Sequence, residues 1–173
     1  MAKLTSPDEG LLLALLNTTP TVAGERIDQL ARADDARAWL ASYGGTSAED
    51  LELLRSTRDT LQALVNGQVA ATALAPALSG VSYNAVLGDS GISWELALPR
   101  DHAVAARAAV AWDILQREAP GRVRACENAA ECSLFLIDHS KSNSARWCSM
   151  SNCGNRMKAR RHYERRRNTQ PAK

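Results

Sequence analysis

Four cysteines are the residues of this sequence whose type and spacing could do chemistry. They are Cys126, Cys132, Cys148 and Cys153, and the 125 residues before them contain no cysteine. Five residues lie inside the first pair, four lie inside the second, and fifteen separate the pairs. Four thiolates suit one tetrahedral zinc ion, which two short loops could hold from opposite sides. The paired spacing favours one zinc ion over four unrelated buried thiols.

Other uses of these residues stay open at this point. Zinc thiolates can be oxidised to disulfides with release of the metal, so a redox switch is one alternative. His139 and His162 are alternative ligands, although four thiolates already complete a tetrahedral shell. Such a shell leaves no position for a reactive water, and residues 1–125 hold a single histidine. The sequence therefore predicts no catalytic residue and no enzyme activity.

A basic segment follows the last cysteine directly. Residues 154–167 contain seven Lys/Arg and one acidic residue, Glu164, and they predict a helix. Guanidinium groups bind phosphate oxygens with paired donors, and a helix in the major groove can present them to guanine. A chain end that is merely solvated is the alternative. We expect nucleic-acid contacts from six residues of this segment: Arg156, Lys158, Arg160, Arg161, Arg165 and Arg166.

The charge of the chain is divided between its two parts. Residues 121–173 hold 12 Lys/Arg and 4 Asp/Glu, a net charge of +8, whereas residues 1–120 carry a net charge of −6. This asymmetry predicts a segment that faces nucleic acid, attached to a body that does not itself bind phosphate. The longest early apolar run, Leu11 to Leu16, is too short for a secretory core or a membrane span. We expect a cytoplasmic protein with no membrane partner, in a reducing compartment where clustered thiols tend to bind metal.

Helical patterns dominate the first 120 residues. Ser6-Pro7-Asp8-Glu9 predicts the start of a helix that carries Leu11 to Leu16, with Ser6 as its cap. Apolar spacing and end signals predict four more helical segments. One carries the face Ala36, Trp39, Leu40 and Tyr43, one runs from Thr46 to Asn66-Gly67, a short one covers 70–79 and a long one covers 101–118.

Two strand pairs are predicted among the helices. Residues 81–87 and 92–98 alternate apolar and polar side chains, and the four residues between them, 88–91, form the turn of a β-hairpin. Residues 123–125 and 134–137 form a second, shorter pair that would place Cys126 and Cys132 on its turn. The sequence thus predicts an α+β protein. Residues 1–120 form a mostly helical body with one hairpin, and residues 121–173 form a small zinc-stapled module with its own core, in which Trp147 is a buried plug, ending in a basic helix.

The C-terminal residues resemble the CGNR zinc finger family, whose motif is present here as Cys153-Gly154-Asn155-Arg156. The N-terminal body, with its run from Leu11 to Thr18 and with Ala38-Trp39-Leu40, is similar to the domain that precedes this finger in bacterial stress-induced transcription regulators. The resemblance implies that the four cysteines hold zinc, that the finger binds DNA and that the body is regulatory. The first cysteine pair has five intervening residues, where the family commonly has four.

These observations predict a zinc-dependent, DNA-binding transcription regulator, and the resemblance relates it to stress. Its body would respond to an unknown effector or form a homodimer. An RNA- or ribosome-associated zinc protein is the second hypothesis. A zinc-scaffolded protein-interaction module is the third.

Overall fold

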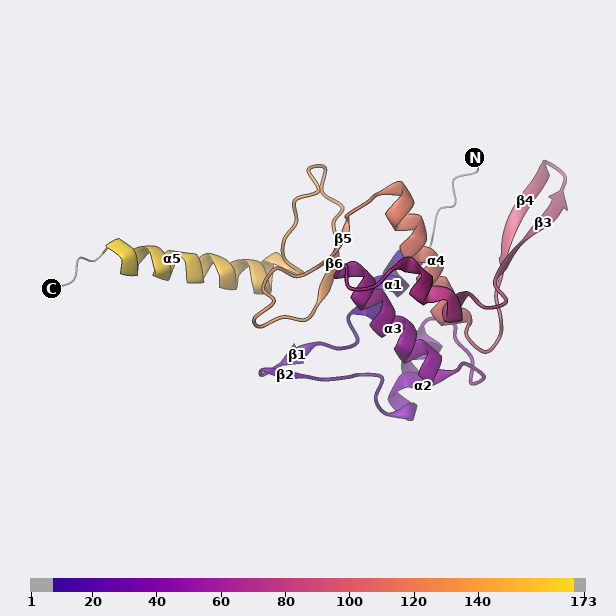
Figure 1. Cartoon of the computed structure of the whole chain (residues 1–173), viewed down its shortest axis with the longest axis horizontal. Coiled ribbons are helices and arrows are strands. Elements are labelled where there is room, and N and C mark those ends of the chain that lie inside the picture. Colours follow the sequence, from indigo (N-terminus) through magenta and orange to yellow (C-terminus); the bar gives the residue numbers. More distant parts are fainter. Residues whose placement is uncertain (1–7, 170–173) are drawn as a thin grey trace.

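The computed structural model describes residues 8–169, and helices make up most of the body. Figure 1 shows these helices gathered side by side in one body. The predicted cap Ser6 and its neighbour Pro7 lie outside the described residues. The helices of the body are α1 (Glu9–Leu16), α2 (Ala33–Ser42), α3 (Leu51–Val65), α4 (Ala103–Glu118) and a short 3-10 helix, η1 (Ala71–Leu78).

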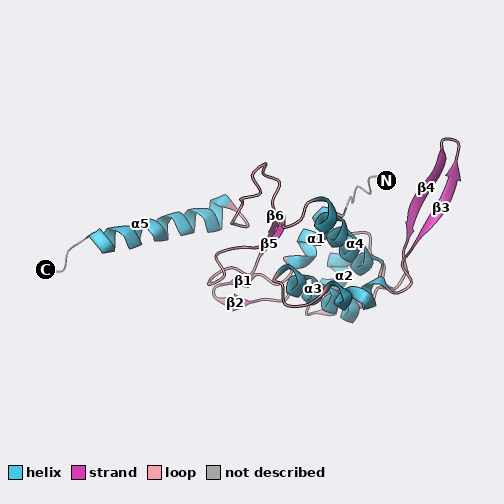
Figure 2. Ribbon diagram, turned by 45° about the horizontal axis from the view of Figure 1, so that its top comes forward, coloured by secondary structure: helices cyan, strands magenta, loops and turns pink. Residues whose placement is uncertain are grey.

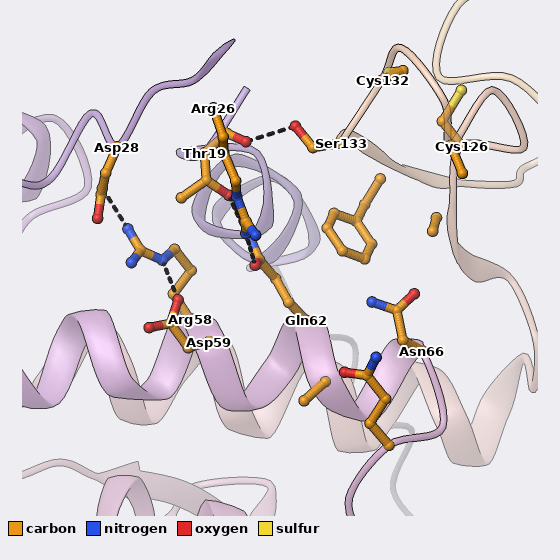
Figure 3. Close-up of a pocket in the computed structure, with 15 residues that line it drawn as sticks. Thr19, Arg26, Asp28, Arg58, Asp59, Gln62, Asn66, Cys126, Cys132 and Ser133 are labelled. Carbon is orange, nitrogen blue, oxygen red and sulfur yellow. Dashed lines mark hydrogen bonds and ion pairs between the residues drawn. The ribbon is translucent and has the colours of Figure 1, made fainter. Parts of the chain in front are cut away.

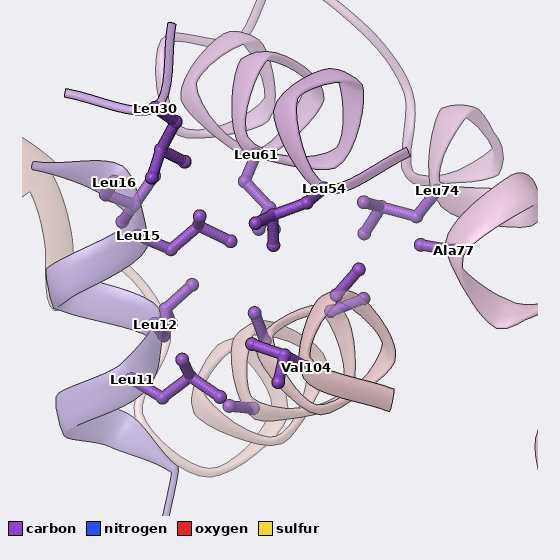
Figure 4. Close-up of a cluster of buried hydrophobic side chains, with 14 of the residues drawn as sticks. Leu11, Leu12, Leu15, Leu16, Leu30, Leu54, Leu61, Leu74, Ala77 and Val104 are labelled. Atoms are coloured by element: carbon purple, nitrogen blue, oxygen red, sulfur yellow. The ribbon is translucent and has the colours of Figure 1, made fainter. Parts of the chain in front are cut away.

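The core of the body is built from leucines of α1 and α3 and from the small residues of α4 (Figure 4). Leu12 and Leu15 of α1 are fully buried against Leu54 and Leu61 of α3. Alanines on α4, such as Ala108, let that helix approach closely because they occupy little volume. The uninterrupted run Leu11 to Leu16 is therefore a helix that is buried on several sides.

The start of α3 differs from the prediction. The helix begins at Leu51, and the side chain of Asp50 accepts hydrogen bonds from the backbone N–H groups of Glu52 and Leu53. The expected start at Thr46 is wrong because Glu49, its supposed capping partner, has another use. Its buried carboxylate accepts a hydrogen bond of 3.2 Å from the N–H of Val104 in the first turn of α4. Burial raises the pKa of Glu49 above its usual value.

The strands of the described chain form three separate antiparallel pairs. The predicted hairpin is confirmed as β3 (Ser82–Gly88) and β4 (Gly91–Ala97), but the predicted four-residue turn is wrong. Gly88 pairs with Gly91, so both strands extend further and a two-residue turn joins them. The short C-terminal pair is confirmed as β5 (Val123–Ala125) and β6 (Phe135–Ile137). A third pair, β1 (Thr21–Val22) and β2 (Glu25–Arg26), was not predicted, so the body has more than one hairpin.

The C-terminal part shares its core with the body, so the expectation of two separate cores is wrong. Val123 and Phe135 are buried in the same cluster as the leucines of α1 and α3. The side chain of Asn17, at the end of α1, accepts a hydrogen bond of 2.7 Å from the N–H of Phe135. Phe135 is the single phenylalanine of the chain, and it completes the body's core instead of forming a second one.

Two elements project from the molecule in opposite directions. The hairpin β3–β4 leaves the body at one end, and α5 (Asn155–Thr169) leaves the C-terminal part at the other (Figures 1 and 2). A π-helical turn, η2 (Met150–Gly154), leads directly into α5. Across residues 8–169, none of the helices combines the length and the apolar character that a membrane crossing requires.

Candidate metal centre and nucleic-acid interface

The structure brings the four cysteine side chains together. Their sulfur atoms all lie within 4.8 Å of one another. The Sγ atom of Cys148 is 3.7 Å from that of Cys132 and 3.6 Å from that of Cys153. With zinc–sulfur bonds of about 2.3 Å, the edges of a tetrahedron of sulfurs measure about 3.8 Å. The quartet therefore fits one tetrahedral zinc ion.

The first two cysteines are placed by β5, β6 and the turn between them. Cys126 follows β5, and its N–H donates to the carbonyl of Leu134 at 2.8 Å. The carbonyl of Asn128 accepts hydrogen bonds from the N–H groups of Glu131 and Cys132, at 3.0 and 2.9 Å. This turn takes up the extra residue between the first two cysteines. The five-residue spacing is thus compatible with a complete quartet.

In the second pair, Cys153 lies within the π-helical turn η2, and Cys148 lies two residues before this turn. The Oγ atom of Ser149 accepts a hydrogen bond from the N–H of Asn152, and the N–H of Gly154 donates to the carbonyl of Ser149 at 3.0 Å. A Cβ atom at position 154 would lie 2.8 Å from the Sδ atom of Met150 and 3.3 Å from Cδ1 of Trp147. A glycine after Cys153 therefore lets the chain turn tightly under these side chains.

The electrostatics of the quartet call for a cation. Burial raises the pKa of Cys126, but hydrogen bonds, led by the N–H of Cys148 at 3.5 Å, outweigh burial and lower it overall. Burial, with the neighbouring thiols, raises the pKa of Cys132 to about 11. Burial and adjacent sulfurs also raise the pKa of Cys148. Four thiolates at this spacing repel one another, and a divalent ion supplies the charge that keeps them deprotonated.

The two histidines considered as alternative ligands do not belong to the quartet. Within the described residues, the group of potential metal ligands consists of the four cysteines. The Nε2 atom of His139 lies 3.7 Å from a carboxylate oxygen of Glu9. His162 is exposed on α5, where its ring meets the edge of Tyr163. The geometry therefore favours the four-cysteine ligand set.

All six predicted nucleic-acid contacts lie exposed on α5: Arg156, Lys158, Arg160, Arg161, Arg165 and Arg166. Residues in a helix advance by about 100° per position, so Lys158, Arg161 and Arg165 share one side of α5. Arg156 and Arg160 lie on another side. The helix therefore presents positive charge in several directions, with the single acidic residue Glu164 paired to Arg160 at 3.2 Å.

Arg156 also joins α5 to the first cysteine loop. Its guanidinium group donates to Glu131 and to the side chain of Asn152, both at 3.1 Å. Glu131 lies next to Cys132, so this contact connects the start of α5 to the loop that carries the first pair. Arg156, the last residue of the Cys153-Gly154-Asn155-Arg156 motif, therefore braces the start of α5 against this loop.

Trp147 is half-buried and lies between arginines, so the expectation of a buried plug is wrong. The guanidinium carbons of Arg146 and Arg161 lie 5.1 and 5.9 Å from the centre of its ring. Arg146 is also paired with Glu127 beside Cys126. Cation–π contacts of this kind hold the ring at the surface of the metal loops.

Two family models match the chain. The model of the CGNR zinc finger matches residues 122–166, which include all four cysteines and most of α5. A second model, ABATE, described as "Putative stress-induced transcription regulator", matches residues 9–135, which is most of the chain. The chain belongs to the ABATE family. No curated protein matches the chain significantly.

The ABATE match and the zinc-finger match overlap over residues 122–135. This segment contains β5, the first cysteine pair and Phe135 at the start of β6. It is also the segment whose Val123 and Phe135 are buried in the core of the body. In this ABATE protein, the segment that carries the first cysteine pair thus packs as part of the body's own core.

Sequence reasoning missed Asp138, which shapes the loop between β6 and Cys148. Its buried carboxylate accepts hydrogen bonds of 2.8 Å from the N–H groups of Ser140 and Ala145, and it pairs with Arg124. Hydrogen bonds, led by one from the side chain of Ser140, lower the pKa of Asp138 to about 2. The signal was an aspartate two residues before a serine at a strand end, which is typical of an Asx turn.

A polar cleft of about 660 Å³ lies between α3 and the first cysteine loop (Figure 3). Its side chains largely satisfy one another. Arg58 pairs with Asp28 at 2.6 Å and with Asp59 at 2.9 Å. Ser133, next to Cys132, donates to the carbonyl of Thr19 at 2.7 Å. Paired charges and a hydroxyl contact along the cleft therefore connect the body to the first cysteine loop.

Proposed function

We propose that the protein is a cytoplasmic, zinc-dependent, DNA-binding transcription regulator in which α5 contacts duplex DNA. The observation that carries this proposal is the position of α5. It begins two residues after the ligand Cys153 and projects from the molecule with six exposed basic side chains.

The charge of α5 favours a polyanionic partner. Between Arg156 and Arg166 the helix holds six basic residues and one acidic residue. An isolated helix of this length is marginal in water, and like charges on neighbouring turns weaken it further. Phosphate groups along both sides of a groove would relieve this repulsion. At 1.5 Å per residue, the 15 residues of α5 span about 22 Å, enough to lie in a major groove.

Zinc would fix the direction in which α5 leaves the body. Two of its ligands, Cys126 and Cys132, lie on a loop that is packed against the regulator domain. The other two, Cys148 and Cys153, lie on the segment that leads into α5. One ion that binds both segments converts a flexible connection into a fixed one, which is the structural role of a closed four-cysteine site.

The regulator domain would act on the finger through their shared packing. Phe135 and Asn17 connect β6 to α1, and Ser133 connects the first cysteine loop to Thr19. An effector that shifts α1 or α3 would therefore change the position of the first cysteine pair. The proposal assigns binding and regulation to this protein and no catalytic step.

Binding of labelled nucleic acids at several salt concentrations tests the proposal. The full zinc-loaded chain is compared on random duplex DNA, on a duplex enriched by selection and on structured RNA of equal length. Six phosphate contacts give a slope of log K against log salt of about −5 for duplex DNA. We expect tighter binding to the selected duplex that persists as the salt rises, because base contacts are less sensitive to salt. Preference for the RNA, or no binding in about 0.15 M salt, would contradict the proposal.

A further inference from the structure

The hairpin β3–β4 has one face that is entirely apolar. Cross-strand partners in an antiparallel pair point to the same side. The register pairs Tyr83 with Leu96, Ala85 with Trp94, and Leu87 with Ile92, so these six side chains share a face. The pairs between them, Ser82 with Ala97, Asn84 with Glu95 and Val86 with Ser93, form the other, mostly polar face.

This apolar face is exposed in the described chain. Leu87 is 81% exposed, Ile92 66%, Trp94 59% and Tyr83 40%. The hairpin projects away from the helices in both views (Figures 1 and 2). A hairpin that packs against nothing is marginally stable in water, and contiguous apolar patches of this kind mark interaction sites. A partner that covers the face would stabilise the hairpin.

The absence of basic residues around the hairpin excludes nucleic acid and anionic lipid as the preferred partners of its apolar face. Residues 71–99 contain no Lys or Arg, and their charged residues are Asp89 in the turn and Glu95 on the polar face. A surface without cations does not attract nucleic acid or anionic lipid. An acidic residue at the tip also opposes insertion of the tip into a bilayer. The chemistry fits another apolar protein surface.

We propose that this face binds the same face of a second copy of the chain, which gives a two-fold symmetric homodimer. A two-fold axis parallel to the strands places β3 of one copy over β4 of the other. Trp94 of each copy then lies over the partner's Ala85, so the largest side chain of the face meets the smallest. Leu87 meets the partner's Ile92, and Tyr83 meets the partner's Leu96. The face is thus complementary to itself, as a two-fold interface requires.

The area of the face suits a reversible dimer. Large aromatic side chains bury about 150–250 Å² each when they are fully covered, and the exposed part of the six side chains amounts to roughly 500 Å² per copy. Two copies would bury about 1,000 Å² in total, which reaches the lower limit for a specific protein interface. A dimer of moderate affinity is expected.

Dimerisation through the hairpin leaves the basic helix accessible. The hairpin and α5 lie at opposite ends of the molecule in Figure 1. The inference therefore does not rest on the proposed DNA binding, and it can be tested in the absence of nucleic acid.

Sedimentation of the full zinc-loaded chain, over a range of concentrations, tests the dimer with a matched pair of variants. Leu87 and Val86 are neighbours on opposite faces of the hairpin. Leu87→Lys would place a charge in the apolar contact and raise the dimer Kd at least about 10-fold, since each 1.4 kcal/mol is tenfold. Val86→Lys would leave the Kd within about threefold of the original. Circular dichroism checks that both variants keep the fold.

An exchange of two residues tests the pairing of Trp94 with Ala85. Ala85→Trp alone would make two tryptophans clash across the interface, and Trp94→Ala alone would leave a cavity between two alanines. Each single variant should therefore weaken the dimer. The double variant carries the same pair in reversed order and would restore the Kd to within about fivefold of the original chain. A chain that stays monomeric at about 100 µM would overturn the proposal, as would a dimer that Leu87→Lys leaves unchanged. A double variant as weak as the two single ones would overturn the two-fold arrangement.

Discussion

The hairpin β3–β4 and the helix α5 extend from opposite ends of the molecule (Figure 1), and their surfaces differ in kind. The hairpin has an exposed apolar face in a stretch without Lys or Arg. The helix is exposed on nearly all sides and carries six basic residues between positions 156 and 166. An apolar face selects another apolar surface, whereas a basic helix selects a polyanion. The molecule thus presents two different kinds of surface at its opposite ends.

The two projecting elements also differ in how they are anchored. The end of β4 is half-buried against the body, and no metal-binding group lies near it within the described residues. The start of α5 follows a cysteine quartet and is braced by the pair Arg156–Glu131. The position of the hairpin therefore depends on ordinary packing, whereas the position of the helix would depend on the metal ion that the quartet binds.

The largest expected effect is the loss of zinc and of DNA affinity when one cysteine ligand is replaced. Cys153→Ser would remove a ligand, so we expect the zinc content to fall from one per chain to near zero. Duplex DNA affinity should fall at least about 100-fold, because loss of a ligand exceeds the 10–100-fold effect of losing a supporting contact. Metal analysis and fluorescence anisotropy measure the two quantities. Val86→Lys, on the mostly polar face of the hairpin, is the control at the other end of the molecule. It should retain both zinc and DNA affinity, because it leaves the proposed dimer contact intact.

Because the core is shared, a substitution that removes a buried side chain of β6 should destabilise the body as well as the metal site. Phe135→Ala should lower the free energy of unfolding by about 3–5 kcal/mol, the usual cost of emptying a buried phenylalanine site. Because Phe135 packs with α1 and α3, helical structure in the body should melt at a lower temperature together with loss of zinc. Calorimetry with parallel metal release measures this. A zinc module that melts alone, with the body unchanged, would contradict the shared core.

Asp138 predicts a pH dependence with a definite sign. The folded pKa of about 2 lies below the usual aspartate value of 3.8, so the ionised form stabilises the fold. This contribution is present above about pH 4 and is lost as the pH falls through about 2. Asp138→Asn should therefore be less stable than the original chain at neutral pH, and the difference should shrink as the pH falls from 4 toward 2. Urea unfolding of both proteins across this range measures it. If the difference in unfolding free energy between the two proteins stayed constant over this pH range, the ionised carboxylate of Asp138 would not contribute to stability.

The smallest expected effects distinguish two basic residues of α5. Arg156→Ala should reduce the salt slope of DNA binding by about one and should also speed zinc loss to a chelator. The second effect should be less than about tenfold, because exposed ion pairs such as Arg156–Glu131 contribute about 0–1 kcal/mol. Lys158→Ala should reduce the salt slope equally and leave zinc loss unchanged. Equal zinc loss from both variants would argue against the bracing role of Arg156.

The sequence predicted the features that depend on local spacing. The cysteine pairs, the strands around residues 81–98 and the basic helix all carry patterns that can be recognised over a few residues. The start of α3 was mispredicted because Glu49 is held by Val104, a residue far away in the sequence. The shared core was missed because Phe135 fits the body by shape, which periodicity does not encode. The sequence shows the apolar face of the hairpin as an alternation of apolar and polar residues. Its exposure could not be predicted, because it depends on whether the helices of the body cover the hairpin.

The most direct test of the account is a zinc titration of the full, reduced, metal-free chain in the presence of labelled duplex DNA. If zinc fixes α5 for binding, the anisotropy should rise with added zinc and reach its plateau at one ion per chain. Magnesium at the same concentrations should have no effect, because four thiolates select a soft ion. Full DNA affinity in the absence of zinc, or a plateau at a different stoichiometry, would contradict the account.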